Sequence, residues 1–136
     1  MTARVMVDSN VLLDVFEEDP VWYAWSSTQI ARLSEASALI INQVIFSEVS
    51  VGFNRIEEVD TAMPALYFVR ETLPWEAAFL AGKCFVQYRR KGGLRRSPLP
   101  DFYIGAHALV GGMRLLTRDA ARYRTYFPKL RLISPE

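Results

Sequence analysis

Residues 4–13 read Arg4-Val5-Met6-Val7-Asp8-Ser9-Asn10-Val11-Leu12-Leu13, and this stretch decides the fold. A short apolar run with two valines stops at Asp8, and the three polar residues that follow are of the types that cap the start of a helix. The apolar residues after them favour that helix. The stretch therefore predicts a buried strand that passes directly into a helix, which is the first unit of an α/β protein.

The rest of the chain repeats this alternation of short apolar runs and longer helical segments. Pro74 precedes one expected helix and Gly92-Gly93 ends it. We expect strands over 4–7, 38–41, 114–117 and 130–133, and, beyond the helix that follows Asp8, helices over 21–36, 43–53, 56–70, 75–91, 101–111 and 119–126. The expected strands are too apolar to be half exposed, so the pattern predicts a parallel sheet covered by helices on both faces.

The composition is that of an ordinary globular protein of single-domain size. The chain has 136 residues, 51% hydrophobic and 23% charged, and no repeat or linker interrupts it, so we treat 1–136 as one domain. Cys84 is the only cysteine and His107 the only histidine, which excludes a disulfide scaffold and a closed zinc site. The apolar runs are too short for a bilayer and no signal peptide is evident, which predicts a cytoplasmic protein.

The net charge of +1 conceals a strong asymmetry along the chain. Residues 1–82 hold 4 Lys and Arg against 12 Asp and Glu, a balance of −8, whereas residues 83–136 hold 12 against 3, a balance of +9. Such polarity indicates a polyanionic partner for the second part. The alternative is that the charges only solvate helix surfaces and that the two parts interleave in space.

Four acidic residues occupy positions that are unusual for a carboxylate. Asp8 and Asp119 follow expected strands, at the sheet edge where α/β proteins place their functional crevice. Glu48 and Asp101 lie on otherwise apolar helix faces, where a charge must be paired, neutralised or bound to metal. Each acid taken singly also has a structural interpretation, as a helix cap, a turn residue or a member of an ion pair.

Taken together, the four acids predict a cation site. No lysine or arginine is spaced to pair with Glu48 or Asp101 within its own helix, and carboxylates about 4 Å apart repel by roughly 4 kcal/mol per pair at an effective dielectric constant of 20. Divalent cations would cancel this charge, and oxygen-only ligands suit Mg²⁺ or Mn²⁺. A pair of such ions is typical of enzymes that direct water onto a phosphodiester.

Several segments of the chain resemble one known family, in its order and spacing and over essentially the whole length. They are Val5-Met6-Val7-Asp8-Ser9-Asn10-Val11-Leu12-Leu13-Asp14, Ser47-Glu48-Val49, Pro100-Asp101-Phe102-Tyr103-Ile104-Gly105-Ala106-His107-Ala108, Leu115-Leu116-Thr117-Arg118-Asp119, Tyr126-Phe127-Pro128 and Ile133-Ser134-Pro135. The chain resembles a PIN-domain nuclease, specifically the VapC-type toxin of a VapBC toxin–antitoxin module. The resemblance implies a three-layer α/β/α sandwich with a central parallel sheet, endoribonuclease activity that depends on one or two Mg²⁺ or Mn²⁺ ions, an antitoxin that blocks the active site, and commonly a homodimer.

The same resemblance assigns roles to individual residues. Asp8, Glu48, Asp101 and Asp119 match the acidic quartet that binds the metal and carries catalysis. Polar positions beside the quartet are matched by Ser9, Asn10 and Thr117.

Basic residues around Gly92-Gly93 are suited to phosphate contacts that position RNA without reading its sequence, and Arg118 beside Asp119 is a second candidate. The residues around the two glycines are Arg89, Arg90, Lys91, Arg95 and Arg96. Their alternative role is a solvated helix end that is favourable to the helix dipole. His107 falls on a different helix face from Asp101, so we expect it to be structural or to face a partner.

Some features leave more than one interpretation open. The aromatic segment Trp22-Tyr23-Ala24-Trp25 has no role in the family pattern, and it is either core packing or a surface for an amphipathic antitoxin helix. A receiver-like phosphoryl-transfer domain is disfavoured, because Asp8-Ser9-Asn10 has no second acid nearby and no Gly-rich phosphate loop occurs. The main alternative to the nuclease is a catalytically silent PIN-like module that binds RNA or regulates.

Overall fold

The computed structural model describes residues 3–93 and 98–135. Its centre is a five-stranded sheet with the order β3-β2-β1-β4-β5, in which all neighbouring strands run parallel. The strands are β1 (Ala3–Val7), β2 (Ser37–Ile41), β3 (Phe68–Arg70), β4 (Arg114–Leu116) and β5 (Leu132–Ile133). The parallel sheet predicted from the apolar runs is confirmed.

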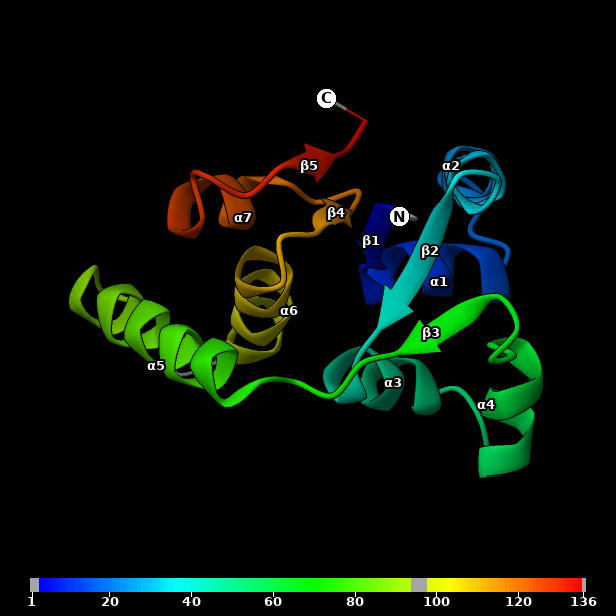
Figure 1. Cartoon of the computed structure of the whole chain (residues 1–136), viewed down its shortest axis with the longest axis horizontal. Helices are drawn as coiled ribbons and strands as arrows, with labels where there is room; N and C mark the ends of the chain where they lie inside the picture. Colours follow the sequence, from blue (N-terminus) through cyan, green and yellow to red (C-terminus); the bar gives the residue numbers. More distant parts are fainter. Residues whose placement is uncertain (1–2, 94–97, 136) are drawn as a thin grey trace.

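Helices lie on both sides of the sheet. In the described parts of the chain they are α1 (Ser9–Phe16), α2 (Tyr23–Ser34), α3 (Gln43–Ser50), α4 (Ile56–Ala62), α5 (Trp75–Arg90), α6 (Leu99–Val110) and α7 (Ala121–Tyr126). Figure 1 shows α5 and α6 to one side of β1, and α1 and α2 to the other. This arrangement confirms the α/β/α class. None of these helices is long and apolar enough to cross a membrane.

The strand order places a functional crevice beside β1. Val5, Met6 and Val7 are 0% exposed, because β1 lies between β2 and β4 and under helices. The chain first builds outward from β1 through β2 and β3, and later adds β4 and β5 on the other side of β1. The sheet therefore has a switch point between β1 and β4, and ligands of open α/β sheets bind outside the carboxyl ends of the strands at such a point.

One expected element is wrong. The sequence pattern predicts a single helix over 56–70, but α4 ends at Ala62 and Phe68–Arg70 forms the edge strand β3, paired in parallel with β2. Pro64 explains the difference, because its ring cannot continue a helix and it disfavours helical backbone at Met63. The helical periodicity of the first seven residues thus does not extend across the proline.

The other predicted elements are present with shifted ends. β5 covers only Leu132–Ile133 of the expected 130–133, and α3 stops at Ser50 instead of Phe53. α7 begins at Ala121, so Asp119 lies in the loop that connects β4 to this helix. That loop starts from the carboxyl end of β4, which brings Asp119 to the switch point.

Candidate active site

Asp8 is a buried carboxylate at the carboxyl end of β1. Its backbone N–H donates to the Leu116 carbonyl at 2.9 Å, which joins the ends of β1 and β4. The residue stands at the N-cap position of α1, but its side chain makes no capping hydrogen bond. Instead, Oδ2 accepts hydrogen bonds from Thr117 Oγ1 at 2.9 Å and Tyr123 Oη at 2.8 Å. The capping interpretation therefore does not explain the Asp8 side chain.

The surroundings of Asp8 oppose its negative charge. Its pKa is raised to about 6: burial is the largest cause, the charges of Asp101 and Glu48 add to it, and the hydrogen bonds from Tyr123 and Thr117 oppose it. Asp8 is thus mostly ionised at neutral pH, in a place where the fold would be more stable with a neutral side chain. A nearby cation would reverse this preference.

Glu48 is linked to Asp8 through a hydroxyl. Ser9 Oγ donates to Glu48 Oε1 at 2.8 Å and lies 3.4 Å from Asp8 Oδ1. Burial raises the pKa of Glu48, the hydrogen bond from Ser9 lowers it, and the charge of Asp101 raises it. Because Glu48 lies on α3 and Asp8 precedes α1, the contact between these two helices brings the carboxylates to the same crevice.

Asp101 has a cationic partner that the sequence analysis did not anticipate. Arg122 Nη1 on α7 lies 2.7 Å from Asp101 Oδ2, across two helices. Burial raises the pKa of Asp101, the hydrogen bond and charge of Arg122 lower it, and the charge of Asp119 raises it. α6 itself holds no lysine or arginine, as the sequence indicates, but the basic partner comes from α7, which packs against the start of α6.

Asp119 lies at the rim of the crevice. Its side chain is exposed, and its backbone N–H donates to Thr117 Oγ1 at 3.1 Å. Its charge acts on Asp101, which in turn acts on Asp8 and Glu48. The four acids are therefore electrostatically linked, although only Asp8 is fully enclosed.

The donor chemistry of this cluster suits a hard divalent cation. All of the candidate ligand atoms are carboxylate oxygens, and the charges of Asp101 and Glu48 add to burial in raising the pKa of Asp8. Within residues 3–93 and 98–135, no three His, Cys, Asp or Glu side chains are arranged to hold an ion. Asp101 instead faces Arg122. The side chains present therefore fit the ion in kind, and their arrangement in the described residues is not that of a formed site.

The three polar residues expected beside the site do lie there. Besides the contacts of Ser9 and Thr117, Asn10 Nδ2 donates to Thr117 Oγ1 at 3.3 Å. The Asn10 Oδ1 accepts from the backbone N–H of Arg118 at 3.4 Å. These bonds tie the end of β1 to the loop after β4, and so fix the spacing between Asp8 and Asp119.

Arg118 has a partner away from the acidic cluster. Its Nε contacts both carboxylate oxygens of Asp14, at 2.9 and 3.0 Å, and its guanidinium carbon lies 5.7 Å from the ring centroid of Trp22. Ser26 Oγ donates to the same buried carboxylate at 2.7 Å. These contacts give Arg118 a structural role in holding the loop against α1 and α2, and its contact with substrate phosphate stays a prediction.

The expected basic loop is described only in part. Arg89 and Arg90 end α5 and are exposed, and Lys91 Nζ lies 5.2 Å from the ring centroid of Tyr126 on α7. Arg95 and Arg96 lie outside the described residues. The predicted phosphate contacts of these five residues are therefore not tested by the structure.

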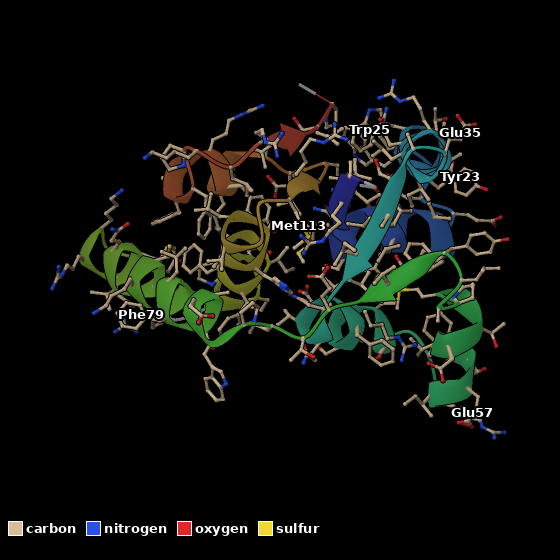
Figure 2. The ribbon with its side chains drawn as sticks, viewed as in Figure 1. Tyr23, Trp25, Glu35, Glu57, Phe79 and Met113 are labelled. Atoms are coloured by element: carbon tan, nitrogen blue, oxygen red, sulfur yellow. The ribbon has the colours of Figure 1, made fainter. Side chains whose placement is uncertain are left out.

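The aromatic segment divides between core and surface. Trp25 packs against the core and meets Trp22 edge to face, with ring centroids 6.2 Å apart. Tyr23 is 42% exposed, and Figure 2 shows it leaving α2 on the opposite side from Trp25. Core packing thus accounts for Trp25, and Tyr23 is the aromatic side chain of this segment that faces solvent.

His107 has a structural role, which is one of the two roles expected of it. It is 1% exposed, its Nδ1 lies 3.1 Å from Asn42 Nδ2, and its Nε2 lies 3.7 Å from Glu71 Oε1. Burial lowers its pKa. The residue joins α6 to the carboxyl ends of β2 and β3.

The sequence analysis overlooked two neighbouring residues of α7. Arg122 reaches Asp101, and Tyr123 reaches Asp8, whose sequence separation from Tyr123 is 115 residues. The available signal was an arginine and a tyrosine three and four residues beyond Asp119, on a helix that must pack near the switch point. The side chains of a short surface helix usually face solvent, whereas these two side chains contact the acidic residues.

We expect Tyr123→Phe to destabilise the protein more at pH 7.5 than at pH 5. The hydroxyl donates to an ionised Asp8 at the higher pH, and a hydrogen bond to a charged group contributes about 2 kcal/mol, against about 1 kcal/mol for a neutral acceptor. Urea unfolding without metal measures both values. Tyr126→Phe is the matched control, because Tyr126 lies on the same helix and its ring packs on Phe102 at 4.9 Å. Equal losses at the two pH values would contradict the charged hydrogen bond.

Comparison with known proteins identifies the family. The sequence matches the PIN domain family over residues 5–128. Among solved structures, the chain is similar to VapBC2 from Rickettsia felis bound to a DNA fragment from their promoter, with a TM-score of 0.71 and 17% identity over 96% of this chain and 98% of that chain. It is also similar to VapBC-1 from nontypeable Haemophilus influenzae, with a TM-score of 0.71 and 17% identity over 96% of this chain and 97% of that chain. A third similar structure is a toxin–antitoxin complex from Klebsiella pneumoniae, with a TM-score of 0.68 and 21% identity over 97% of this chain and 98% of that chain.

No curated protein sequence matches the chain. At identities of 21% or less the structural likeness establishes the fold, and it covers nearly the whole length of each chain. The family match spans the acidic residues at 8, 48, 101 and 119 together with α7. On this sequence match and this fold, the chain belongs to the PIN-domain family.

Proposed function

We propose that this protein is a Mg²⁺- or Mn²⁺-dependent endoribonuclease that acts as the VapC-type toxin of a toxin–antitoxin pair. The observation that carries the proposal is the buried Asp8 at the switch point, whose pKa is raised to about 6 partly by the charges of Asp101 and Glu48. A fold of ordinary stability retains such repulsion where it serves a function. Nucleases of phosphodiesters are a class of enzyme that needs a cluster of ionised carboxylates.

Asp8, Glu48, Asp101 and Asp119 would hold the cation. A bound divalent ion supplies positive charge that activates water and stabilises the oxygen leaving the phosphorus. Ser9, Thr117 and Tyr123 fix the orientation of the carboxylates through the hydrogen bonds described above. Asp8 must be ionised to act as a ligand, so metal binding and release of its proton are coupled.

The charge distribution supports a polyanionic substrate, as the proposed RNA is. Residues 83–136 carry 12 Lys and Arg against 3 acids, and the exposed Arg89, Arg90 and Lys91 lie at the end of α5. With Arg95, Arg96 and Arg118 they would contact phosphates and position the strand. Because cellular RNA is the proposed substrate, the cytoplasm is the proposed location.

An antitoxin protein and a second copy of the chain are the proposed protein partners. Support for the antitoxin comes from the similar structures, which are VapBC and other toxin–antitoxin complexes, and from the exposed Tyr23 on α2. Support for a homodimer comes from α5, where Trp75 is 88% and Phe79 is 68% exposed one helical turn apart. Figure 2 labels Phe79 on this helix, at the margin of the molecule.

The test is cleavage of RNA by the purified protein free of antitoxin. We expect total cellular RNA to be cut in Mg²⁺ or Mn²⁺ and left intact with chelator, with the cut ends mapped by sequencing. The same ions should raise the melting temperature, because a ligand that binds only the folded state stabilises it by mass action. Asp101→Asn is the inactive control.

Two outcomes would overturn the proposal. Melting unaffected by either ion, together with intact RNA, would favour the silent RNA-binding or regulatory module. Cleavage that is unchanged in both Asp8→Asn and Asp101→Asn would show that another site cuts the RNA.

A further inference from the structure

Arg122 pairs with Asp101, one of the four carboxylates proposed to hold the metal. Its Nη1 lies 2.7 Å from Asp101 Oδ2, and the two side chains are 42% and 34% exposed. Arg122 stands in the first turn of α7 and Asp101 in the first turn of α6. A guanidinium therefore takes up one oxygen of a residue that the cation site requires.

The position of Arg122 on α7 ties this contact to the rest of the cluster. The next residue, Tyr123, donates to Asp8, and Asp119 just before the helix acts electrostatically on Asp101. Tyr123 is 1% exposed and anchors the helix in the core. The Arg122 side chain, by contrast, is partly exposed, so it has space to change partner while α7 stays in place.

A guanidinium and a divalent cation cannot both hold the same carboxylate oxygen without strong repulsion. An exposed pair of this kind is weak, contributing at most a severalfold change in an equilibrium. A divalent cation that gains several carboxylate ligands can therefore displace it. The released guanidinium would remain at the mouth of the crevice, and its planar fork matches the oxygens of a phosphate.

We propose that Arg122 exchanges partners: it pairs with Asp101 in the metal-free protein, leaves it when a divalent cation binds, and then contacts the phosphate of the bound RNA. This inference rests on the proposed nuclease function. It assigns to Arg122 two roles that are measured separately, as a competitor of the metal and as a residue that binds substrate.

The first measurement is Mn²⁺ affinity without RNA, by titration calorimetry at pH 7.5 and low salt. We expect Arg122→Gln to bind Mn²⁺ up to about fivefold more tightly than the wild type, because the competing charge is removed. Arg122→Lys keeps the charge and should stay close to the wild type. Arg131→Gln is the matched control, because Arg131 lies at the amino end of β5, away from the carboxyl ends of the strands, and contacts the Gly112 carbonyl at 3.4 Å.

The second measurement is cleavage of a fluorescent RNA in saturating Mn²⁺ at several salt concentrations. For Arg122→Gln we expect KM to rise more than kcat falls, and the slope of log KM against log salt to decrease by about one relative to wild type. Arg131→Gln should keep the wild-type slope. A residue that only anchors α7 would alter neither the Mn²⁺ affinity nor this slope.

Either of two results overturns the exchange: Mn²⁺ affinity that is unchanged or weaker in Arg122→Gln, or a salt slope equal to that of the wild type. Urea unfolding of Arg122→Gln verifies that the variant is folded, and Arg122→Met, which also removes the charge, serves in its place if it is not, with the same tighter Mn²⁺ binding expected. Failure of the nuclease proposal looks different, because the wild type itself would then neither bind Mn²⁺ nor cut RNA.

Discussion

Asp8→Asn should abolish cleavage and at the same time stabilise the metal-free protein at neutral pH. The folded pKa of about 6 lies above the value of about 3.9 for an exposed aspartate. Ionised Asp8 thus destabilises the fold above pH 6, by up to about 3 kcal/mol, and this penalty disappears as the pH falls below about 4. Asparagine keeps an acceptor for Thr117 and Tyr123 and carries no charge, so the variant escapes the penalty.

Urea unfolding of the two proteins between pH 4 and pH 8 in chelator measures this difference directly. The variant should be more stable at pH 7.5 and equal to the wild type near pH 4, and added Mg²⁺ should narrow the gap by stabilising only the wild type. Cleavage should fall about 10³-fold or more, since a metal site contributes several kcal/mol to the barrier. A variant that is less stable than the wild type at pH 7.5 would contradict the uncompensated charge at Asp8.

Asp14→Asn should have the opposite effect on stability, with a loss of roughly 2 to 3 kcal/mol at pH 7.5. Asp14 is as buried as Asp8, at 2% exposed, but it has a cation within 2.9 Å in Arg118 and a donor in Ser26. Breaking a buried ion pair costs about 3 to 5 kcal/mol, and we reduce this figure because the Arg118 side chain is 31% exposed.

The double variant Asp14→Asn/Arg118→Met tests whether the loss of stability comes from the ion pair or from the burial of each side chain. If the ion pair is the cause, the second change should add little to the first, because its partner is already gone. Stability that rises in Asp14→Asn, as expected for Asp8→Asn, would show that both aspartates are strained charges and that Arg118 does not compensate Asp14.

Strands that are buried on both faces could be predicted from the sequence, because burial requires them to be apolar. β1, β2 and β4 are short, apolar and enclosed on both faces, so their composition reveals them without knowledge of the neighbours. β3 is different, because only Phe68 of its three residues is buried. Such an edge strand exists because β2 offers a free edge for pairing, and that pairing is a tertiary property which local periodicity does not contain.

The candidate site was predictable to the extent that its residues break a local pattern. Glu48 and Asp101 are charges on apolar faces, and Asp8 and Asp119 are acids at the ends of strands, so each was visible by itself. Arg122 and Tyr123 break no local pattern, since an arginine and a tyrosine on a short helix are ordinary. Their partners lie 21 and 115 residues away, and only the packing of α7 against the switch point makes them part of the site.

By itself, the sequence determined the α/β class, the parallel sheet and the four acids, because apolar runs must be buried and a charge among apolar residues requires a partner. The tertiary structure decided which partners three of these acids and the buried Asp14 have: hydroxyls for Asp8 and Glu48, Arg122 for Asp101, and Arg118 for Asp14. The physical reason is that electrostatic and hydrogen-bond contributions depend on distances of a few ångströms between side chains. Those distances are set by the strand order and helix packing of the whole fold, and no local segment contains them.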